Sequence, residues 1–176
     1  MLIHSASQLL TLAGGPRRGD DLGQLEIIPD GAVLVQGKKV VAVGRTSDLL
    51  DAYPDEPVLD AAGKVVMPGF VDPHTHAIWL GDRSAEFEQR LEGKTYLEIL
   101  AAGGGILSTV RETRAGSMQK LMAQTRSRLR TMFNHGTTTA EVKTGYGLRT
   151  AAELCMLQAL LLLVTAMPGL PSFACS

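Results

Sequence analysis

The hydrophobic pattern of this chain changes once, at about residue 68, and that change constrains the fold more than any other feature. Before it, short β-branched runs are separated by turn residues. Ala32–Gln36 and Val40–Gly44 lie on either side of a Gly-containing segment, and two such runs predict a β-hairpin. Val58–Asp60 and Lys64–Met67 repeat the pattern across Ala61–Gly63, so a second hairpin is expected there.

A short helix is expected between these strands, over Ser47–Ala52. Turn residues occupy Gly14–Pro16 and Pro29–Gly31. The sequence therefore predicts a small β-sheet module over residues 1–67 that carries no chemistry of its own.

After residue 68 the pattern alternates between strands and helices. Ser117 is a good N-cap for a long helix whose apolar stripe follows spacings of three and four. The stripe consists of Leu121, Thr125, Leu129, Met132 and Phe133. The arginines at 126, 128 and 130 are expected on the solvated face, and the charges over 86–94 indicate a solvated pattern. The other expected elements are strands over 68–72 and 137–142 and helices over 95–102 and 150–163. Strand, helix and strand in this order predict βα units and a parallel sheet.

Composition excludes several classes of protein. Seventeen Lys and Arg balance eighteen Asp and Glu, so the chain has no electrostatic footprint for nucleic acid or an anionic membrane. Two distant cysteines favour a reducing compartment. The N-terminus lacks a signal-peptide pattern, and the longest apolar run, Leu154–Met167, is too short for an ordinary membrane span. A cytoplasmic protein is expected.

Two histidines follow the first strand of the βα region. His74 and His76 are two residues apart, and in an extended segment such residues project to the same side. Both imidazoles can therefore reach one metal ion, for which neutral imidazole is a good ligand. The carboxyl end of a barrel strand is also where catalytic residues lie. A surface pair or a hydrogen-bonded pair remains the alternative for an isolated His-x-His.

A catalytic metal site needs three protein ligands, and the other histidines do not supply one. His4 lies in the β module and His135 at a helix end.

Arg83 suits a substrate carboxylate, because its planar guanidinium can bind both carboxylate oxygens, or it forms a surface salt bridge. Tyr146, between two glycines, presents its hydroxyl to a ligand or plugs a turn.

Four segments resemble one family in order and spacing. They are Val66–His76, Gly81–Glu88, Ala101–Val110 and Glu141–Leu148. The first resembles the strand-one motif of the amidohydrolase superfamily, and all four together resemble the imidazolonepropionase family. The resemblance runs from about residue 25 to residue 160.

The resemblance implies a metal-dependent hydrolysis with one Zn²⁺ or Fe³⁺ per subunit. Water would open the ring amide of 4-imidazolone-5-propanoate to N-formimidoyl-L-glutamate. By the same resemblance His74 and His76 are metal ligands, and Arg83 and Tyr146 bind the small-molecule substrate. No catalytic residue is identified, since the general base of the family is expected beyond residue 176. A homodimer is also implied.

The implied fold is α/β, an incomplete (β/α)₈ TIM barrel with a partial β-sandwich. The sandwich part covers residues 1–67, the first βα units residues 68–163, and an atypical tail residues 164–176. The family is more than twice as long, so we expect a truncated, alternatively spliced or frameshifted chain. Exposed sheet edges and helix faces would make it unstable or prone to aggregation.

Two alternatives remain for the function. The chain is a non-catalytic truncated product or association module, which we favour over turnover by this chain alone. Otherwise it resembles another cyclic amidohydrolase, which the Gly103–Gly105 and Lys143–Gly147 segments argue against.

Overall fold

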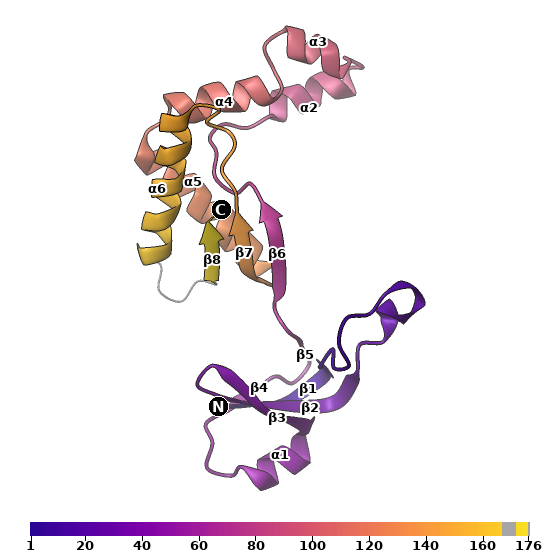
Figure 1. Cartoon of the computed structure of the whole chain (residues 1–176). Helices are drawn as coiled ribbons and strands as arrows, with labels where there is room; N and C mark the ends of the chain where they lie inside the picture. The colour runs from indigo at the N-terminus through magenta and orange to yellow at the C-terminus, as the bar shows by residue number, and fades with distance from the viewer. Residues whose placement is uncertain (167–171, 176) are drawn as a thin grey trace. The chain divides into compact units, whose positions relative to one another are not determined.

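The chain divides into two compact units, Met1–Pro68 and Gly69–Ser176, and each is considered by itself (Figure 1). The computed structural model describes residues 1–166 and 172–175. The elements of the first unit are β1 (Leu2–Leu10), the 3₁₀ turn η1 (Gly19–Gly23), β2 (Ile27–Gln36), β3 (Lys39–Arg45), α1 (Thr46–Ala52), β4 (Val58–Asp60) and β5 (Val65–Val66).

The first unit is a five-stranded sheet in the order β3-β2-β1-β4, with β5 also paired to β1. β2 and β3 pair antiparallel, so the first predicted hairpin is confirmed. The second is wrong, because β4 and β5 do not pair with each other. Both run parallel to β1, one after the other along its free edge. The turn between them bonds to that edge, since Ala61 N donates to His4 O at 2.8 Å. An open edge of a long strand offered more ladder hydrogen bonds than a two-residue strand could.

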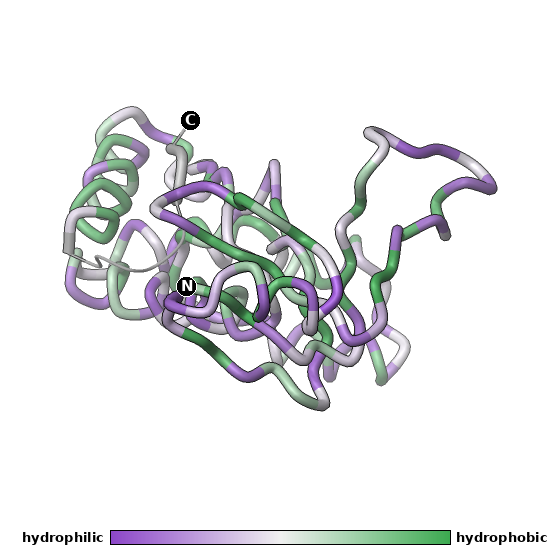
Figure 2. Tube along the Cα trace, turned by 90° about the horizontal axis from the view of Figure 1, so that it is seen from below, coloured by the Kyte–Doolittle hydropathy of each residue, from purple (hydrophilic) through white to green (hydrophobic). Residues whose placement is uncertain are grey.

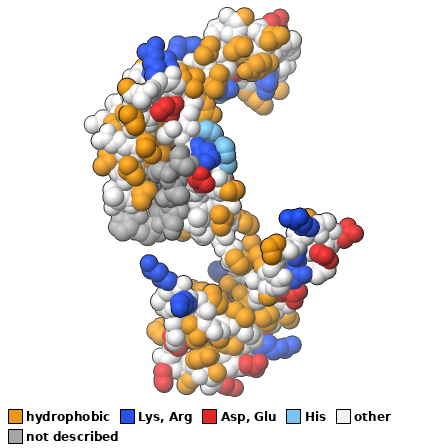
Figure 3. Space-filling model, in the orientation of Figure 1, with side chains coloured by type: hydrophobic (Ala, Val, Ile, Leu, Met, Phe, Trp, Pro, Cys, Tyr) orange, Lys and Arg blue, Asp and Glu red, His pale blue; other side chains and the backbone are white. Residues whose placement is uncertain are grey.

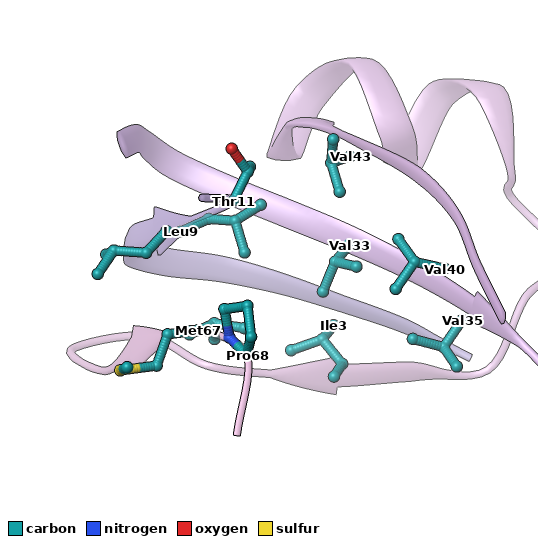
Figure 4. Close-up of a pocket in the computed structure, with 11 residues that line it drawn as sticks. Ile3, Leu9, Thr11, Val33, Val35, Val40, Val43, Met67 and Pro68 are labelled. Carbon is teal, nitrogen blue, oxygen red and sulfur yellow. The ribbon is translucent and has the colours of Figure 1, made fainter. Parts of the chain in front are cut away.

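The two faces of this sheet are covered differently. On one face α1 packs its Leu49 with Leu2, Ala32 and Leu34 into a buried cluster. The other face forms an apolar groove of about 310 Å³, shown in Figure 4. Its lining includes Ile3, Leu9, Val33, Val35, Val40, Val43, Met67 and Pro68.

The second unit alternates strands and helices, as predicted. Its elements are β6 (Phe70–Thr75), α2 (Ser84–Leu91), α3 (Tyr96–Ala101), α4 (Ile106–Ala115), α5 (Met118–Asn134), β7 (Thr137–Val142), α6 (Thr150–Ala166) and β8 (Ser172–Cys175). The sheet order is β6-β7-β8, and both pairings are parallel, which confirms the predicted parallel sheet. α5 contacts β7 and α6 contacts β8, so these helices cover one face, while α2 and α3 lie beyond the carboxyl ends of the strands (Figure 1).

The core of the second unit lies between the sheet and the helices α5 and α6. It contains Ala77, Ile78, Leu80, Leu121, Leu129, Ala140, Val142, Met156, Ala159 and Leu160. The Ser117 N-cap is confirmed, because its side chain accepts from Lys120 N. Phe133 is 42% exposed, so the prediction that it belongs to the buried stripe of α5 is wrong.

α6 is apolar along most of its length (green in Figure 2, leading into the grey trace), and its Leu161 and Leu162 remain exposed.

Two helices are absent from the sequence prediction. α2 covers the charged run for which only a solvated pattern is predicted, and α4 comes after the glycines for which only a stop and a turn are predicted. The stop is real, since Gly103 has φ +86°. Gly105 then starts α4 with φ +70°, and its N–H donates to Glu86 Oε1 at 2.8 Å. A glycine run that ends one helix can therefore begin the next.

The structure describes part of the predicted tail. α6 continues to Ala166, so residues 164–166 are helical, and the backbone of residues 172–175 forms β8 beside β7. Residues 167–171 and 176 lie outside the described part. Among the described helices, none combines the length and the apolar character needed to cross a bilayer.

Candidate functional site

His74 and His76 lie together at the carboxyl end of β6, as predicted. Both are exposed, and their ring centroids are 5.4 Å apart. The pale-blue histidine surface of this unit faces solvent in Figure 3. Asp72 Oδ1 accepts from His74 N at 3.1 Å, which holds the backbone as the strand ends. Two imidazoles on one side of a strand are a donor set that suits Zn²⁺ or iron.

Tyr146 comes to the same place from the end of β7. Its ring centroid is 5.6 Å from that of His76 and 6.3 Å from that of Trp79. Gly145, with φ +137°, passes so close to His76 that a Cβ would lie 3.2 Å from the imidazole Cε1. Parallel strands that end at one edge therefore bring a histidine pair and a phenol together, although they are about 70 residues apart in the sequence.

Arg83 lies beside this group, at the N-cap of α2. Its Nε donates to Thr109 Oγ1 at 3.2 Å, and Thr109 is buried on α4. No carboxylate among the described residues is within ion-pair distance of Arg83, so the surface salt bridge is not found there. A cavity of about 300 Å³ is lined by Trp79, Asp82, Arg83, Thr109 and Tyr146.

The segment that leaves β6, residues 76–80 and here termed the β6 exit, is held by Arg128. This guanidinium donates to Trp79 O at 2.7 Å and to Ala77 O at 3.1 Å. Its Cζ lies 3.6 Å from the centroid of the Trp79 ring, a cation–π contact. The solvated position predicted for Arg128 is therefore wrong. The carbonyls of an irregular segment need donors, and this arginine of α5 supplies them.

The segment that leaves β7, residues 143–148 and here termed the β7 loop, is held by Glu153. Its Oε2 accepts from Gly145 N at 2.8 Å, and its Oε1 accepts from Gly147 N at 2.8 Å and Leu148 N at 2.7 Å. From α4, Arg114 Nε donates to Gly147 O at 2.6 Å. Both charged groups therefore bind the backbone on either side of Tyr146. The Tyr146 side chain itself lies beside His76.

Hydrogen bonding sets the charge state of Glu153. Partial burial alone would raise its pKa, but bonds from the Thr144 side chain and from the N–H groups of Leu148, Gly147 and Gly145 lower the pKa below the ordinary value. The carboxylate is therefore ionised at neutral pH.

The described residues bring no third side chain of a metal-ligand type together with His74 and His76. His135 caps the C-terminus of α5, and His4 lies in β1 with its Nδ1 2.9 Å from Ser5 Oγ. Among the described residues no group of three His, Cys, Asp or Glu could hold an ion.

Sequence reasoning missed Arg128, Arg114 and Glu153. A signal existed for Glu153 alone, because Thr150 and Glu153 have the spacing of a capping box. Its carboxylate instead reaches back to residues 145, 147 and 148. The two arginines bind carbonyls of segments that are distant in sequence, and no local pattern predicts such contacts.

Comparison with known proteins gives two family matches. A family described as imidazolonepropionase-like composite domain, bacteria, matches residues 31–55. The amidohydrolase family matches residues 57–98, a range that includes the histidine pair and Arg83.

The chain is also similar to curated proteins. It is 52% identical over 170 residues to an imidazolonepropionase of Chloroflexus aggregans, a match that covers 96% of this chain and 40% of that protein. It is 54% identical over 162 residues to an imidazolonepropionase of Halobacterium salinarum, covering 90% of this chain and 38% of the relative. The chain thus spans about 40% of the length of these relatives.

A solved structure shares the fold at low identity. The zinc complex of atrazine chlorohydrolase from Arthrobacter aurescens TC1 is 19% identical, with a TM-score of 0.59 over 99% of this chain and 35% of that one. The chain therefore shares its fold with part of that hydrolase. Nearly the whole chain resembles the amino-terminal part of the imidazolonepropionases, within the amidohydrolase family, as its four motifs predicted.

Proposed function

We propose that this chain carries the amino-terminal part of an imidazolonepropionase. The reaction is the addition of water to the ring amide of 4-imidazolone-5-propanoate, with cleavage of the C–N bond to give N-formimidoyl-L-glutamate. The observation that carries the proposal is the meeting of His76, Tyr146 and Arg83 around the ends of β6 and β7 in a sequence 52% identical to such an enzyme.

His74 and His76 are the two metal ligands that this chain contributes. Bound between them and further ligands, Zn²⁺ or Fe³⁺ would lower the pKa of a water molecule and polarise the ring carbonyl. The exposed, convergent imidazoles fit either ion. Two donors are fewer than a catalytic site needs, so we expect the chain alone to bind metal weakly and to open no ring.

Arg83 and Tyr146 are the substrate-binding residues. With its Nε already bonded to Thr109, Arg83 keeps its terminal nitrogens for the propionate, which a guanidinium binds through both oxygens. The Tyr146 hydroxyl donates a hydrogen bond to a substrate oxygen. The family fold, a (β/α)₈ barrel with a β-sandwich shared between both ends of the protein, would complete the site. A homodimer in the cytoplasm is part of this proposal.

A chimera tests this function. Residues 1–160 of this chain replace the aligned segment of the Chloroflexus aggregans imidazolonepropionase, and product formation is followed by mass spectrometry with Zn²⁺ or Fe²⁺ added. We expect ring opening by the chimera and none by the 176-residue chain. A folded, metal-loaded chimera without activity, beside an active parent enzyme, would overturn the proposal.

The ligand assignment has its own variants. His74→Ala with His76→Ala in the chimera is expected to lower kcat/KM at least ~10³-fold, because the ion that activates water is lost. His135→Ala is the matched control, since it removes an exposed imidazole at the end of α5. Equal activity of the double variant and the control would refute the assignment of the two ligands.

A further inference from the structure

We propose that Glu153 and Arg114 are positioning residues that hold Tyr146 against the histidine pair, and this rests on the proposed function. Glu153 and Arg114, which carry opposite charges, both bind the backbone of the β7 loop. The Glu153 carboxylate takes N–H groups on both sides of Tyr146, and Arg114 takes the carbonyl of Gly147. Neither residue touches the candidate substrate cavity, so each acts through Tyr146.

The β7 loop needs such a clamp because its backbone is not regular. Leu148 has φ +48°, a conformation that is costly for a leucine. Gly147 is packed so tightly that a Cβ would lie 2.9 Å from both Ala152 Cβ and Glu153 N. Without fixed partners these residues would relax, and the phenol between Gly145 and Gly147 would move with them.

The donor and acceptor count favours a carboxylate at this position. Three N–H groups point at Glu153, and a carboxylate offers two oxygens with about four acceptor sites. Glutamine of the same shape offers one oxygen, and its NH₂ group would face an N–H of the loop. Glu153→Gln therefore breaks the clamp with little change in volume.

The first test needs no activity. The 176-residue chain has three tyrosines, so 3-fluorotyrosine labelling gives three ¹⁹F signals, and Tyr146→Phe assigns one of them. Glu153→Gln and Arg114→Gln are expected to shift or broaden the Tyr146 signal alone. Amide exchange at Gly145, Gly147 and Leu148 should accelerate at least ~10-fold, since hydrogen bonds to charged groups are the stronger ones.

The chain offers matched controls for both substitutions. Glu98, like Glu153, is an acidic residue in the first turn of its helix, and its carboxylate accepts from Thr95 N at 2.8 Å. Arg111 also lies on α4 and donates to a glycine carbonyl, Gly103 O at 2.6 Å. Glu98→Gln and Arg111→Gln should leave the Tyr146 signal unchanged. An unchanged signal and unchanged exchange in Glu153→Gln would overturn the proposal.

The second test uses the active chimera. Glu153→Gln is expected to raise KM ~10-fold and to change kcat less than ~3-fold, because Tyr146 is assigned to substrate binding. In a Tyr146→Phe background the same substitution should have no further effect on KM, since residues that act through one group are not additive. An equal KM increase in both backgrounds would refute positioning through Tyr146. An inactive chimera would contradict the proposed function. The ¹⁹F experiment would still test whether Glu153 and Arg114 position Tyr146.

Discussion

The β6 exit and the β7 loop are both irregular segments whose backbone groups need hydrogen-bond partners. Side chains of opposite charge supply those partners in the two segments. In the β6 exit two backbone carbonyls are bound by the guanidinium of Arg128 from α5. In the β7 loop three backbone N–H groups are bound by the carboxylate of Glu153 from the first turn of α6. In both, the charge comes from a helix that packs against the sheet.

The difference between the two segments lies in their burial. Ala77, Ile78 and Leu80 of the β6 exit belong to the core, whereas most of the β7 loop is only partly buried. Loss of the Arg128 bonds therefore leaves buried carbonyls without partners, which costs stability. Loss of the Glu153 bonds leaves the N–H groups of Gly145 and Leu148 accessible to water and only that of the buried Gly147 without a partner, so the geometry of Tyr146 is expected to change more than the stability of the unit.

The largest effect is expected from Arg128→Ala. This change removes hydrogen bonds to Ala77 O, Trp79 O and Gln124 Oε1 and the contact with the Trp79 ring. The free energy of unfolding should fall by about 2–4 kcal/mol, measured by urea denaturation with far-UV circular dichroism. The exposed Arg130→Ala is the control, with less than about 0.5 kcal/mol expected. Equal urea midpoints for Arg128→Ala and Arg130→Ala would contradict the larger contribution of the β6 exit to stability.

Gly147→Ala is expected to have the next largest effect. The added Cβ would lie 2.9 Å from Ala152 Cβ and 3.0 Å from Ala152 C, and overpacking of this kind costs about 1–3 kcal/mol. The same denaturation experiment measures it. Gly23→Ala serves as the control, because a Cβ there meets nothing within 4 Å. No difference between the two would mean that the β7 loop adapts freely.

Trp79→Phe should have a smaller effect on stability. Phenylalanine keeps an aromatic ring but binds the Arg128 guanidinium less strongly, so about 0.5–1 kcal/mol of stability is expected to be lost. Circular dichroism is the readout, since Trp79 is the single tryptophan. In an Arg128→Ala background the effect should shrink, because its partner is gone; full additivity of the two changes would contradict the contact.

The smallest effect is expected from pH, and it separates the two segments. The pKa of Glu153 lies below its ordinary value of 4.5. A carboxylate with a lowered pKa stabilises the folded state fully above the unfolded value, and this contribution is lost as pH falls through the folded pKa. The β7 loop should therefore loosen only below about pH 4.5, whereas Arg128 stays charged and keeps the β6 exit in place.

The ¹⁹F signal of Tyr146 measures this loosening locally. A local probe is needed because hydrogen bonds also lower the pKa values of Glu56, Asp82 and Glu98. The titration should disappear in Glu153→Gln. If that variant titrates like the parent chain, another acid controls the loop.

Much of the site was predictable from sequence because its residues come directly after predictable strands. Thr137–Val142 is β-branched at most positions, and β7 has these bounds. The His74 and His76 pair is a consequence of strand geometry, and its rings lie 5.4 Å apart as expected for one side of a strand. The first hairpin and the Ser117 cap depend on turn and cap chemistry between neighbours in the chain.

The sequence predictions failed where a local pattern does not describe the segments that lie next to it in the fold. The second hairpin was wrong because the free edge of β1 competed for the same strands. Arg128 was placed in solvent because helical spacing describes a helix by itself and not the carbonyls of the β6 exit beside it. α4 was missed because a glycine run signals the end of one helix but not the start of another.

The sequence by itself determined the family resemblance, the parallel βα order, the histidine pair and the candidates Arg83 and Tyr146, because local spacing and strand geometry carry this information. Only the tertiary structure decided that Tyr146 lies beside His76, and that Arg128, Glu153 and Arg114 hold the backbone around them. The physical reason is that irregular segments must find hydrogen-bond partners wherever the packed helices present them, and Arg114 and Arg128 are distant in sequence from the carbonyls that they bind.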